Sequence, residues 1–261
     1  RHPPAYERMN QLGLASVGIP TLVGNELTLV ADTDEILKEI AREIDDAKST
    51  VHLMFYIWHP GGLADKVVES LLRANTRGVK CRVLVDALGS ATWWKSDLCK
   101  QLKNAGVEVT RAMPTGLIRA ITARNDLRLH RKIVVVDGEI AWTGSMNLVD
   151  PKFFKQDAGV GQWVDAMARI KGPAVEALLG ILLSDLKLET GQQLQQLLET
   201  SDLKRLKSEG NSDVQVIPSG PGEGIAEDAI LQMILNMIYA AICFIAGKNL
   251  LNYFSKFVFF H

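Results

Sequence analysis

Cysteine is scarce in this chain, and the few cysteines present form no recognisable pattern. Cys81, Cys99 and Cys243 are odd in number and lack the short spacings of a metal-binding or redox motif. Cys81 lies in an apolar run that predicts a buried strand, where a small thiol packs as a hydrophobic residue. We therefore expect no metal and no cofactor, and a reducing compartment is the simpler environment for these thiols.

An excess of charge of either sign is also absent. Lysine and arginine total 29 against 30 aspartates and glutamates, a formal net charge of −1, which argues against a general nucleic-acid binder. Residues 111–132 differ, because Asp126 is the single acid among six basic residues: Arg111, Arg119, Arg124, Arg128, Arg131 and Lys132. We interpret this segment as one that attracts anionic groups, with Arg128 and Arg131 as candidate substrate-binding residues. The alternative is a solvated loop.

Apolar residues make up 47% of the 261 residues, so the chain can bury a sizeable core in one or two domains. From residue 27 onward the pattern becomes regular. Residues 27–58 predict a strand, then a helix that begins at Asp32 or Thr33, then a buried strand over 51–58. An apolar stripe at helical spacing supports the helix: Ile36, Ile40 and Ile44.

The same alternation of helix and strand continues. A second helix is predicted over residues 63–76, ending near Gly78, and it leads into a strand over 79–87. This alternation predicts an α/β fold with a largely parallel sheet. The polar residues that come before it, 1–26, are expected to be an irregular N-terminal segment.

The most specific pattern is LHRKIVVVDGEIAWTGSMN, residues 129–147. A neutral imidazole at His130 can attack the phosphorus of a phosphodiester and form a phosphohistidine. The ammonium of Lys132 and the amide of Asn147 can stabilise charge on the non-bridging oxygens. Ser145 offers a hydroxyl to the same oxygens, and Gly144 allows close approach of the backbone. These residue types at this spacing therefore predict a site that handles phosphate esters.

The middle of this pattern predicts a hairpin. Residues 133–136 are apolar and β-branched, Asp137-Gly138 is typical of a tight turn, and residues 140–143 form the returning strand. Asp137 is a member of the candidate site, but its place in the turn favours a structural role, capping backbone amides.

The pattern of residues 129–147 resembles the HKD signature of the phospholipase D superfamily at every defining position. Residues 55–90, 161–185 and 214–222 look like the first repeat of bacterial cardiolipin synthases, so the resemblance runs from about residue 27 to 222. It implies a phospholipase D-like α-β-α sandwich with a mixed, largely parallel sheet flanked by helices. It also implies metal-independent chemistry.

Two further candidates lie outside the signature. Trp163-Val164-Asp165 resembles the tryptophan-x-acid segment that follows the signature in the family, and it implies that Asp165 orients the catalytic imidazole. The alternative is an acid on an edge strand, facing solvent. His59, beside Gly61-Gly62 at a strand end, is a candidate headgroup contact, although a histidine in a turn is more often an ordinary loop residue. A further pair, Trp93-Trp94, is either an interfacial anchor or part of the core.

Near the C-terminus an earlier pattern recurs. Residues 214–220 followed by 227–247 echo residues 27–58 in their order of strand, turn, helix and strand. We therefore divide the chain into a first repeat, 27–210, and the start of a second repeat, 211–261, that is truncated or altered at its end. Residues 229–247 carry no formal charge, so a membrane span is an alternative interpretation of that segment.

The resemblance implies a cardiolipin-synthase-like phosphatidyltransferase that converts two phosphatidylglycerol molecules to cardiolipin and glycerol. The family reaction uses two signatures and this chain has one, so we expect impaired activity unless a homodimer or a second repeat completes the site. The expected partners are anionic phospholipid and a membrane surface, with peripheral contact at the bacterial inner membrane; nucleic acid is disfavoured. The alternatives are a phospholipase D or phosphodiesterase, a single-motif dimeric nuclease, and an inactive lipid-binding remnant.

Overall fold

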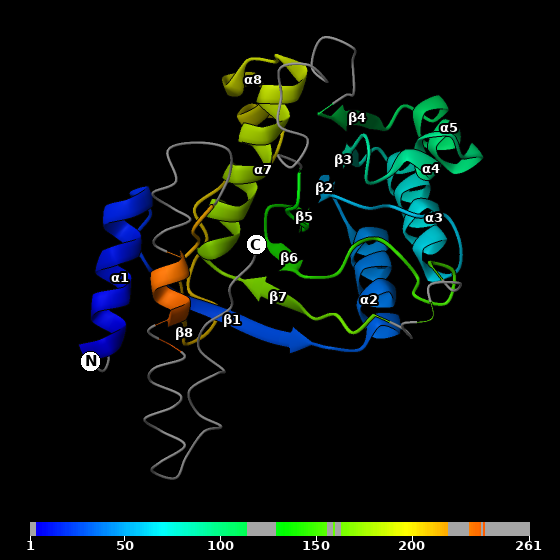
Figure 1. The fold of residues 1–261 in the computed structure, drawn as a ribbon. Coiled ribbons are helices and arrows are strands. Elements are labelled where there is room, and N and C mark those ends of the chain that lie inside the picture. Colours follow the sequence, from blue (N-terminus) through cyan, green and yellow to red (C-terminus); the bar gives the residue numbers. More distant parts are fainter. Residues whose placement is uncertain are drawn as a thin grey trace, which may run out of the picture.

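The structure is a computed structural model that describes residues 4–113, 129–155, 159, 163–218, 230–235 and 237. Its helices and strands follow one another along the chain as shown in Figure 1. In chain order they are α1 (Pro4–Val17), β1 (Leu22–Val30), α2 (Thr33–Asp46), β2 (Thr50–Phe55), α3 (Leu63–Thr76), β3 (Lys80–Asp86), α4 (Ala91–Trp94), α5 (Asp97–Asn104), β4 (Glu108–Ala112), β5 (Ile133–Val136), β6 (Ile140–Gly144), β7 (Met167–Lys171), α7 (Ala174–Thr190), α8 (Leu194–Glu199) and β8 (Ser212–Val214).

The described strands form one eight-stranded sheet in the order β4-β3-β2-β5-β6-β7-β1-β8. The sheet is mixed, as predicted, but the prediction that it is largely parallel is wrong. Two pairings, β2–β3 and β3–β4, are parallel, and the five others are antiparallel. Among neighbouring strands, only β2–β3 and β3–β4 are joined by a helical connection, whereas the tight turn between β5 and β6 reverses the chain.

Helices cover both faces of this sheet. Along β2, Val51, Leu53 and Phe55 pack into the core beneath α2 and α3, whereas Met54 packs toward α7 on the opposite face. This division follows from the alternation of side chains along a strand. Figure 1 shows α7 on one side of the sheet and α2 and α3 on the other. The predicted α-β-α sandwich is therefore confirmed.

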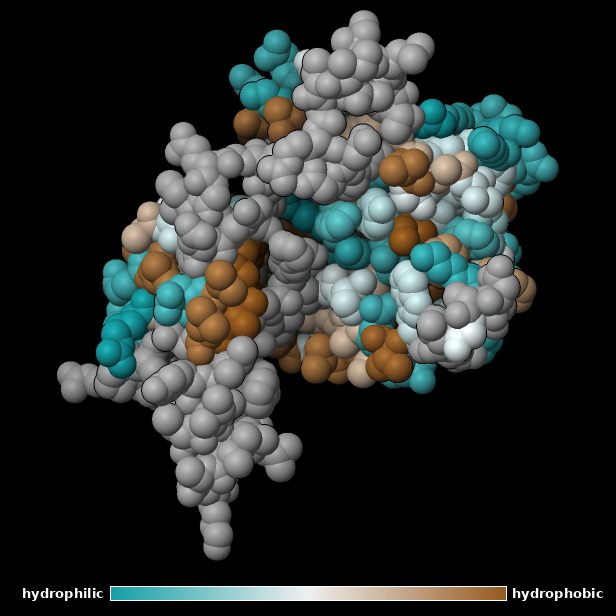
Figure 2. All heavy atoms as spheres, viewed as in Figure 1, coloured by the Kyte–Doolittle hydropathy of each residue, from teal (hydrophilic) through white to brown (hydrophobic). Residues whose placement is uncertain are grey.

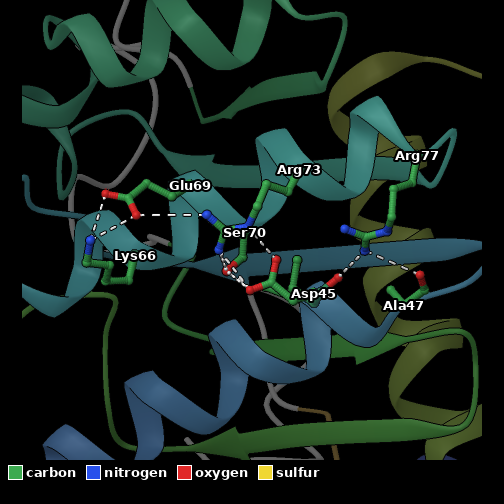
Figure 3. A network of polar contacts seen from close by, with 8 residues as sticks. Asp45, Ala47, Lys66, Glu69, Ser70, Arg73 and Arg77 are labelled. Carbon is green, nitrogen blue, oxygen red and sulfur yellow. Dashed lines mark hydrogen bonds and ion pairs between the residues drawn. The ribbon is translucent and has the colours of Figure 1, made fainter.

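Polar side chains connect the two helices on one face. The guanidinium of Arg73 donates to both carboxylate oxygens of Asp45, at 2.8 Å each, and the Ser70 hydroxyl donates to the same carboxylate at 3.0 Å. Arg77 donates to the backbone carbonyl of Ile44 at 3.1 Å (Figure 3). The apolar stripe of α2, formed by Ile36, Ile40 and Ile44, is buried. The polar contacts therefore add directional constraints to this apolar packing and restrict rotation of α2 relative to α3.

The N-terminal segment was expected to be irregular, and that expectation is wrong. Residues 4–17 form α1, and β1 already begins at Leu22. The sequence does contain the signals for this helix: Pro4 occupies its first position, and Gly18 follows its end with a φ of 71°. The sequence interpretation missed the helix because its apolar face is weak. Among the α1 residues whose side chains are described, Met9 is the one deeply buried hydrophobic residue.

The tryptophan pair belongs to the core. Trp93 is fully buried and stacks on Trp58 with ring centroids 4.4 Å apart, and Trp94 is 8% exposed. The interpretation as a membrane anchor is therefore wrong for these two residues, and the packing alternative holds. No helix within the described ranges is long and apolar enough to cross a membrane, and most of residues 229–247 lies outside those ranges.

The described C-terminal residues continue the same sheet. β8 pairs antiparallel with β1, at Leu22↔Val214 and Asn25↔Ser212, and residues 230–235 are helical. Leu231 and Leu235 on this helix are at least half exposed, and Figure 2 shows a brown patch in the region where Figure 1 draws this helix. A strand followed by a helix fits the predicted internal repeat; the assignment of residues 211–261 to a second repeat stays a prediction.

A polar network holds the β5–β6 turn against the beginning of β2. The carboxylate of Asp137 accepts hydrogen bonds from the backbone N–H groups of Lys48, Ser49 and Thr50, at 2.9, 2.8 and 3.0 Å. Burial alone would raise the pKa of Asp137, but these N–H groups together hold it below its ordinary value. Asp137 therefore joins two strands that are distant in the sequence.

Beside this network lies a buried histidine. His52 on β2 is fully buried and pairs in register with Arg82 on β3. Arg82 is itself 3% exposed and donates to the carbonyl of Thr200 and the hydroxyl of Ser201, at 3.0 and 2.7 Å. Burial, and then the charges of Arg82 and Lys80, lower the pKa of His52 to about 3. The imidazole is therefore neutral in the folded protein.

We predict that Asp137→Asn destabilises the fold by ~1–3 kcal/mol, because an amide loses the charge that the three N–H groups stabilise. Urea unfolding at pH 7 measures this loss. The pKa of Asp137 is lowered by folding, so its contribution is present above the ordinary carboxyl pKa and disappears as the pH falls through the folded value. A deficit that persists unchanged at pH 3 would argue against this cause.

We predict that His52 makes the fold acid-sensitive. Its folded pKa of about 3 lies below the ordinary value of 6.5, so only the unfolded state binds a proton between these limits. Stability is therefore fully present above pH 6.5 and decreases as the pH falls, by up to about 1.4 kcal/mol per pH unit. Urea unfolding of wild type and His52→Gln at several pH values measures this; equal slopes would refute it.

Candidate active site

The candidate site residues gather at one edge of the sheet because of the strand directions. β2 and β3 end at this edge, at Phe55 and Asp86, whereas β5 begins there at Ile133. The antiparallel partners β6 and β7 meet at the same edge, where Gly144 faces Met167. Residues that directly precede β5 and β7 or follow β6 are therefore brought together, although up to 36 positions separate them.

His130 is exposed at this edge, just before β5. Its ring lies against that of Tyr56, which follows β2, with centroids 4.4 Å apart and a tilt of 52°. The imidazole therefore lies at the surface of this edge of the sheet, where the ends of β2, β3 and β6 meet the beginnings of β5 and β7. We call it the catalytic edge, and a phosphodiester can reach the imidazole there. The position is consistent with the predicted role as a nucleophile, which itself stays a prediction.

Lys132 lies next to this histidine and near Asp165. Its ammonium donates to the backbone carbonyl of His130 at 2.5 Å. Partial burial lowers the pKa of Lys132, and the charge of Asp165 acts in the opposite direction. Asp165 therefore lies close enough to favour the ammonium form of Lys132. The role that the sequence suggests for Asp165, orienting the His130 ring, stays a prediction.

Asn147 and Ser145 follow β6. Asn147 is 8% exposed, and its side-chain oxygen accepts a hydrogen bond from the backbone N–H of Ile57 at 2.9 Å. That bond fixes the orientation of the amide, so its NH₂ group is the part that can serve as a donor. The Ser145 hydroxyl is exposed and accepts a hydrogen bond from the N–H of Ala166 at 3.1 Å.

Gly144 has a packing reason to be glycine. A Cβ atom at this position would lie 2.2 Å from the carbonyl oxygen of Ala166 and 2.7 Å from the Cα of Met167. The close approach that glycine permits here is therefore that of the β7 backbone. Contact of Gly144 with a substrate stays a prediction.

Asp137 lies at the opposite end of β5 from His130, bound to the backbone at the beginning of β2. The structure therefore does not bring it to the catalytic edge with His130, Lys132 and Ser145. Its inclusion among the candidate catalytic residues is corrected on this ground, because a strand of four residues separates it from that edge.

The candidate substrate-binding residues differ in their surroundings. His59 is half-buried with its ring centroid 5.1 Å from that of Phe154, and its buried Nδ1 atom has no hydrogen-bond partner in the described structure. Arg131 forms an ion pair with Asp185 of α7 at 2.5 Å, which is a structural contact. Arg128 lies outside the described residues.

Two residues that the sequence interpretation missed contact His130 or the residue before it. Tyr56 provides the ring described above. Asp86, fully buried at the end of β3, accepts hydrogen bonds from the backbone N–H groups of Leu88 and Gly89, at 2.8 Å each. Its other oxygen lies 3.4 Å from the backbone nitrogen of Leu129. An acid as the last residue of a buried apolar strand is the signal that could have indicated Asp86.

The arrangement can support displacement at phosphorus. An accessible imidazole, an ammonium and a fixed amide donor lie at one edge of the sheet, which is the set that attack and charge stabilisation require. In the part of the chain that the structure describes, no group of three or more histidine, cysteine, aspartate or glutamate side chains is placed to hold a metal ion.

Comparison with known proteins identifies the family of this chain. The family described as cardiolipin synthase, phospholipase D-like domain matches residues 40–170, which is 131 of the 261 residues. Cardiolipin synthase A of Erwinia tasmaniensis is 47% identical over 225 residues, and that of Yersinia pseudotuberculosis is 45% identical over 224. Each match covers 86% of this chain and 46% of the relative, so the chain spans about half the length of these curated relatives.

Among solved structures, the phospholipase D family member Nuc from Salmonella typhimurium superposes with a TM-score of 0.48 and 17% identity, over 62% of this chain and 95% of that one. The family that the sequence resembles is thereby confirmed by the family match and the relatives. The chain belongs to the cardiolipin synthase family of phospholipase D-like domains, and it carries the HKD signature of that superfamily once.

Proposed function

We propose that this chain provides the nucleophilic half of a phosphatidyltransferase that makes cardiolipin from phosphatidylglycerol. The single observation that carries the proposal is the group formed by His130, Lys132 and Asn147 at one sheet edge, in a chain of the cardiolipin synthase family. The 45–47% identical relatives are named as synthases of cardiolipin, and the resemblance to that family suggests phosphatidylglycerol as the substrate.

The proposed reaction has two displacements. The imidazole of His130 attacks the phosphorus of one phosphatidylglycerol, and the P–O bond to the glycerol headgroup breaks as that oxygen takes a proton. The hydroxyl of a second phosphatidylglycerol then loses a proton and attacks the phosphohistidine, which releases cardiolipin and free histidine. Lys132 and the Asn147 amide stabilise the charge on the non-bridging oxygens in both steps.

The proton that the leaving glycerol takes needs a second acid, which the superfamily takes from a second signature. This sequence has one HxK pattern, at His130 and Lys132. We propose that another copy of the chain, or the second repeat of a longer protein, supplies the missing group. Activity of one isolated copy would then be impaired.

We also propose that the catalytic edge contacts the membrane surface peripherally. Phe153, Phe154, Lys155, Trp163 and Val164 form what we call the aromatic rim of this edge. Phe153 is 55% exposed and Val164 is 91% exposed. The Lys155 ammonium lies 5.3 and 5.5 Å from the ring centroids of Phe154 and Trp163. Aromatic rings beside a cation suit the headgroup region of a bilayer of anionic phospholipid, which is the proposed location at the bacterial inner membrane.

We predict that the purified chain forms cardiolipin slowly from phosphatidylglycerol vesicles, with a rate per chain that rises with protein concentration. His130→Ala should abolish the product, and Lys132→Ala should lower kcat by about 10²–10³-fold, because it removes charge stabilisation from the transition state. Mass spectrometry of the lipid products measures both effects.

The products also separate the alternatives. Phosphatidic acid would indicate transfer to water, and cleaved nucleic acid a nuclease. A folded chain that binds vesicles but yields no product at any concentration would indicate a lipid-binding remnant. Robust turnover by His130→Ala would contradict the mechanism altogether.

We predict that Val164→Asp lowers the affinity for phosphatidylglycerol vesicles by about tenfold, because a carboxylate in the aromatic rim is repelled by anionic headgroups and cannot enter the interface. Val23→Asp is the matched control, since Val23 is 63% exposed but lies at the other end of the sheet, near the start of β1. Vesicle sedimentation measures both affinities. Equal affinity in the two variants would rule out the rim as the contact surface.

A further inference from the structure

We propose that Tyr56 and Asp86 are positioning residues that hold the His130 imidazole in one orientation before substrate arrives. The inference rests on the proposed role of His130 as the nucleophile. Neither residue belongs to the HKD signature, and they follow β2 and end β3, respectively. Their connection to His130 consists of one ring contact and one chain of buried hydrogen bonds.

The ring of Tyr56 is the surface against which the imidazole rests. The two ring centroids are 4.4 Å apart and the planes are tilted by 52°, a separation at which aromatic rings are in van der Waals contact. His130 is an exposed residue, and a ring packed against its imidazole restricts the rotation of that side chain. The orientation of the nucleophile therefore depends on where Tyr56 is held.

Tyr56 is held by the turn that follows β3. The hydroxyl of Ser90 donates to the backbone carbonyl of Tyr56 at 2.9 Å and accepts from the N–H of Trp58 at 2.8 Å. Gly89 lies flat against the same residue. A Cβ atom there would be 2.5 Å from the Tyr56 carbonyl oxygen and 2.7 Å from a ring carbon. Even the smallest side chain at position 89 must therefore displace Tyr56 or the turn.

Asp86 fixes this turn and also reaches the residue next to the nucleophile. One carboxylate oxygen accepts from the N–H groups of Leu88 and Gly89, at 2.8 Å each, and the other faces the N–H of Leu129 at 3.4 Å. The backbone carbonyl of Asp86 accepts from the indole N–H of Trp94 at 3.0 Å. A single buried carboxylate thus connects the turn that presses on Tyr56 with the backbone that carries His130.

Such a connection matters for nucleophilic attack. An imidazole nitrogen must point at phosphorus along the line of the leaving oxygen, and a misplacement of about 1 Å can cost about 10²-fold in rate. An exposed histidine on a chain segment would lose part of that alignment to rotation. The buried contacts of Tyr56 and Asp86 reduce this freedom before the substrate binds, without any contact to the reacting atoms.

The test is a measurement on His130 that does not need turnover. We would record the imidazole C–H signals of the five histidines by NMR, assign His130 by its loss in His130→Ala, and compare variants that leave the His130 side chain untouched. Gly89→Ala and Asp86→Asn should shift and broaden the His130 signal, because the ring samples several orientations. They should also change the rate at which diethylpyrocarbonate modifies His130.

Two controls separate positioning from general destabilisation. Tyr56→Phe keeps the ring and should retain the wild-type signal, whereas Tyr56→Leu should not. Gly180→Ala changes a glycine of α7 at which an added Cβ would meet no described atom within 4 Å apart from those of its chain neighbours and its own helix backbone, and it should leave His130 unchanged. If Asp86→Asn does not fold, Gly89→Ala and the Tyr56 pair still decide the question.

The inference is overturned if folded Gly89→Ala and Tyr56→Leu both keep the wild-type His130 signal and modification rate. Where cardiolipin is formed, the same variants should lower kcat by about tenfold or more with little change in KM. A perturbed His130 signal without turnover in any variant would support the positioning role while contradicting the proposed function, so the two failures can be told apart.

Discussion

The antiparallel pairing of β5 with β2 is the contact on which the rest of this structure depends. It inserts the hairpin of the HKD signature into the middle of the sheet, beside the strands that the helical crossovers connect. The beginning of β5 consequently meets the ends of β2 and β3, which places His130 against Tyr56 and next to the turn at Asp86. All four residues of β5 are apolar and buried, two on each face of the sheet, so a shift by one residue would still leave apolar side chains on both faces. The hydrophobic pattern of β5 therefore does not fix this register by itself, and the contacts of Asp137 with the backbone before β2 supply the missing constraint.

This pairing is secured from the far edge of the sheet. Asp137 binds the backbone that leads into β2, and buried Arg82 binds the residues that follow α8, so the edge opposite the catalytic one is rich in fixed polar contacts. The catalytic edge is different, since His130 and Ser145 are exposed there. The polar contacts that hold the strands in register thus lie at one end of the strands, and the exposed side chains of His130 and Ser145 lie at the other end. This division explains how an aspartate can belong to the signature without lying near the histidine.

Local signals in the sequence were sufficient for much of the fold. The N-cap at Asp32, the stripe of isoleucines in α2 and the break at Gly78 gave elements whose bounds agree closely with the structure. The HKD signature likewise indicated most of the site. The sequence did not indicate which distant residues lie together. These relations are the antiparallel pairing of most neighbouring strands, the stacking of Trp93 on Trp58, and the contacts of Tyr56 and Asp86 with the segment around His130. Such relations depend on which strands become neighbours, and a spacing pattern does not contain that information.

The short strand β8 has a consequence for where this chain can be divided. Residues 212–214 were assigned to a second repeat, yet their backbone pairs with β1 in the same eight-stranded sheet as the predicted first repeat. Removing them would leave the backbone N–H and C=O groups of β1 that face β8 without their partners, and β1 would become the edge strand. Two hydrophobic side chains of β1, Val23 and Leu29, are already more than half exposed. Open edges of this kind recruit strands from other molecules, and aggregation follows. The predicted repeat boundary at residue 210 is thus a poor place to cut this chain, because the sheet that holds the predicted first repeat continues through β8 to Val214.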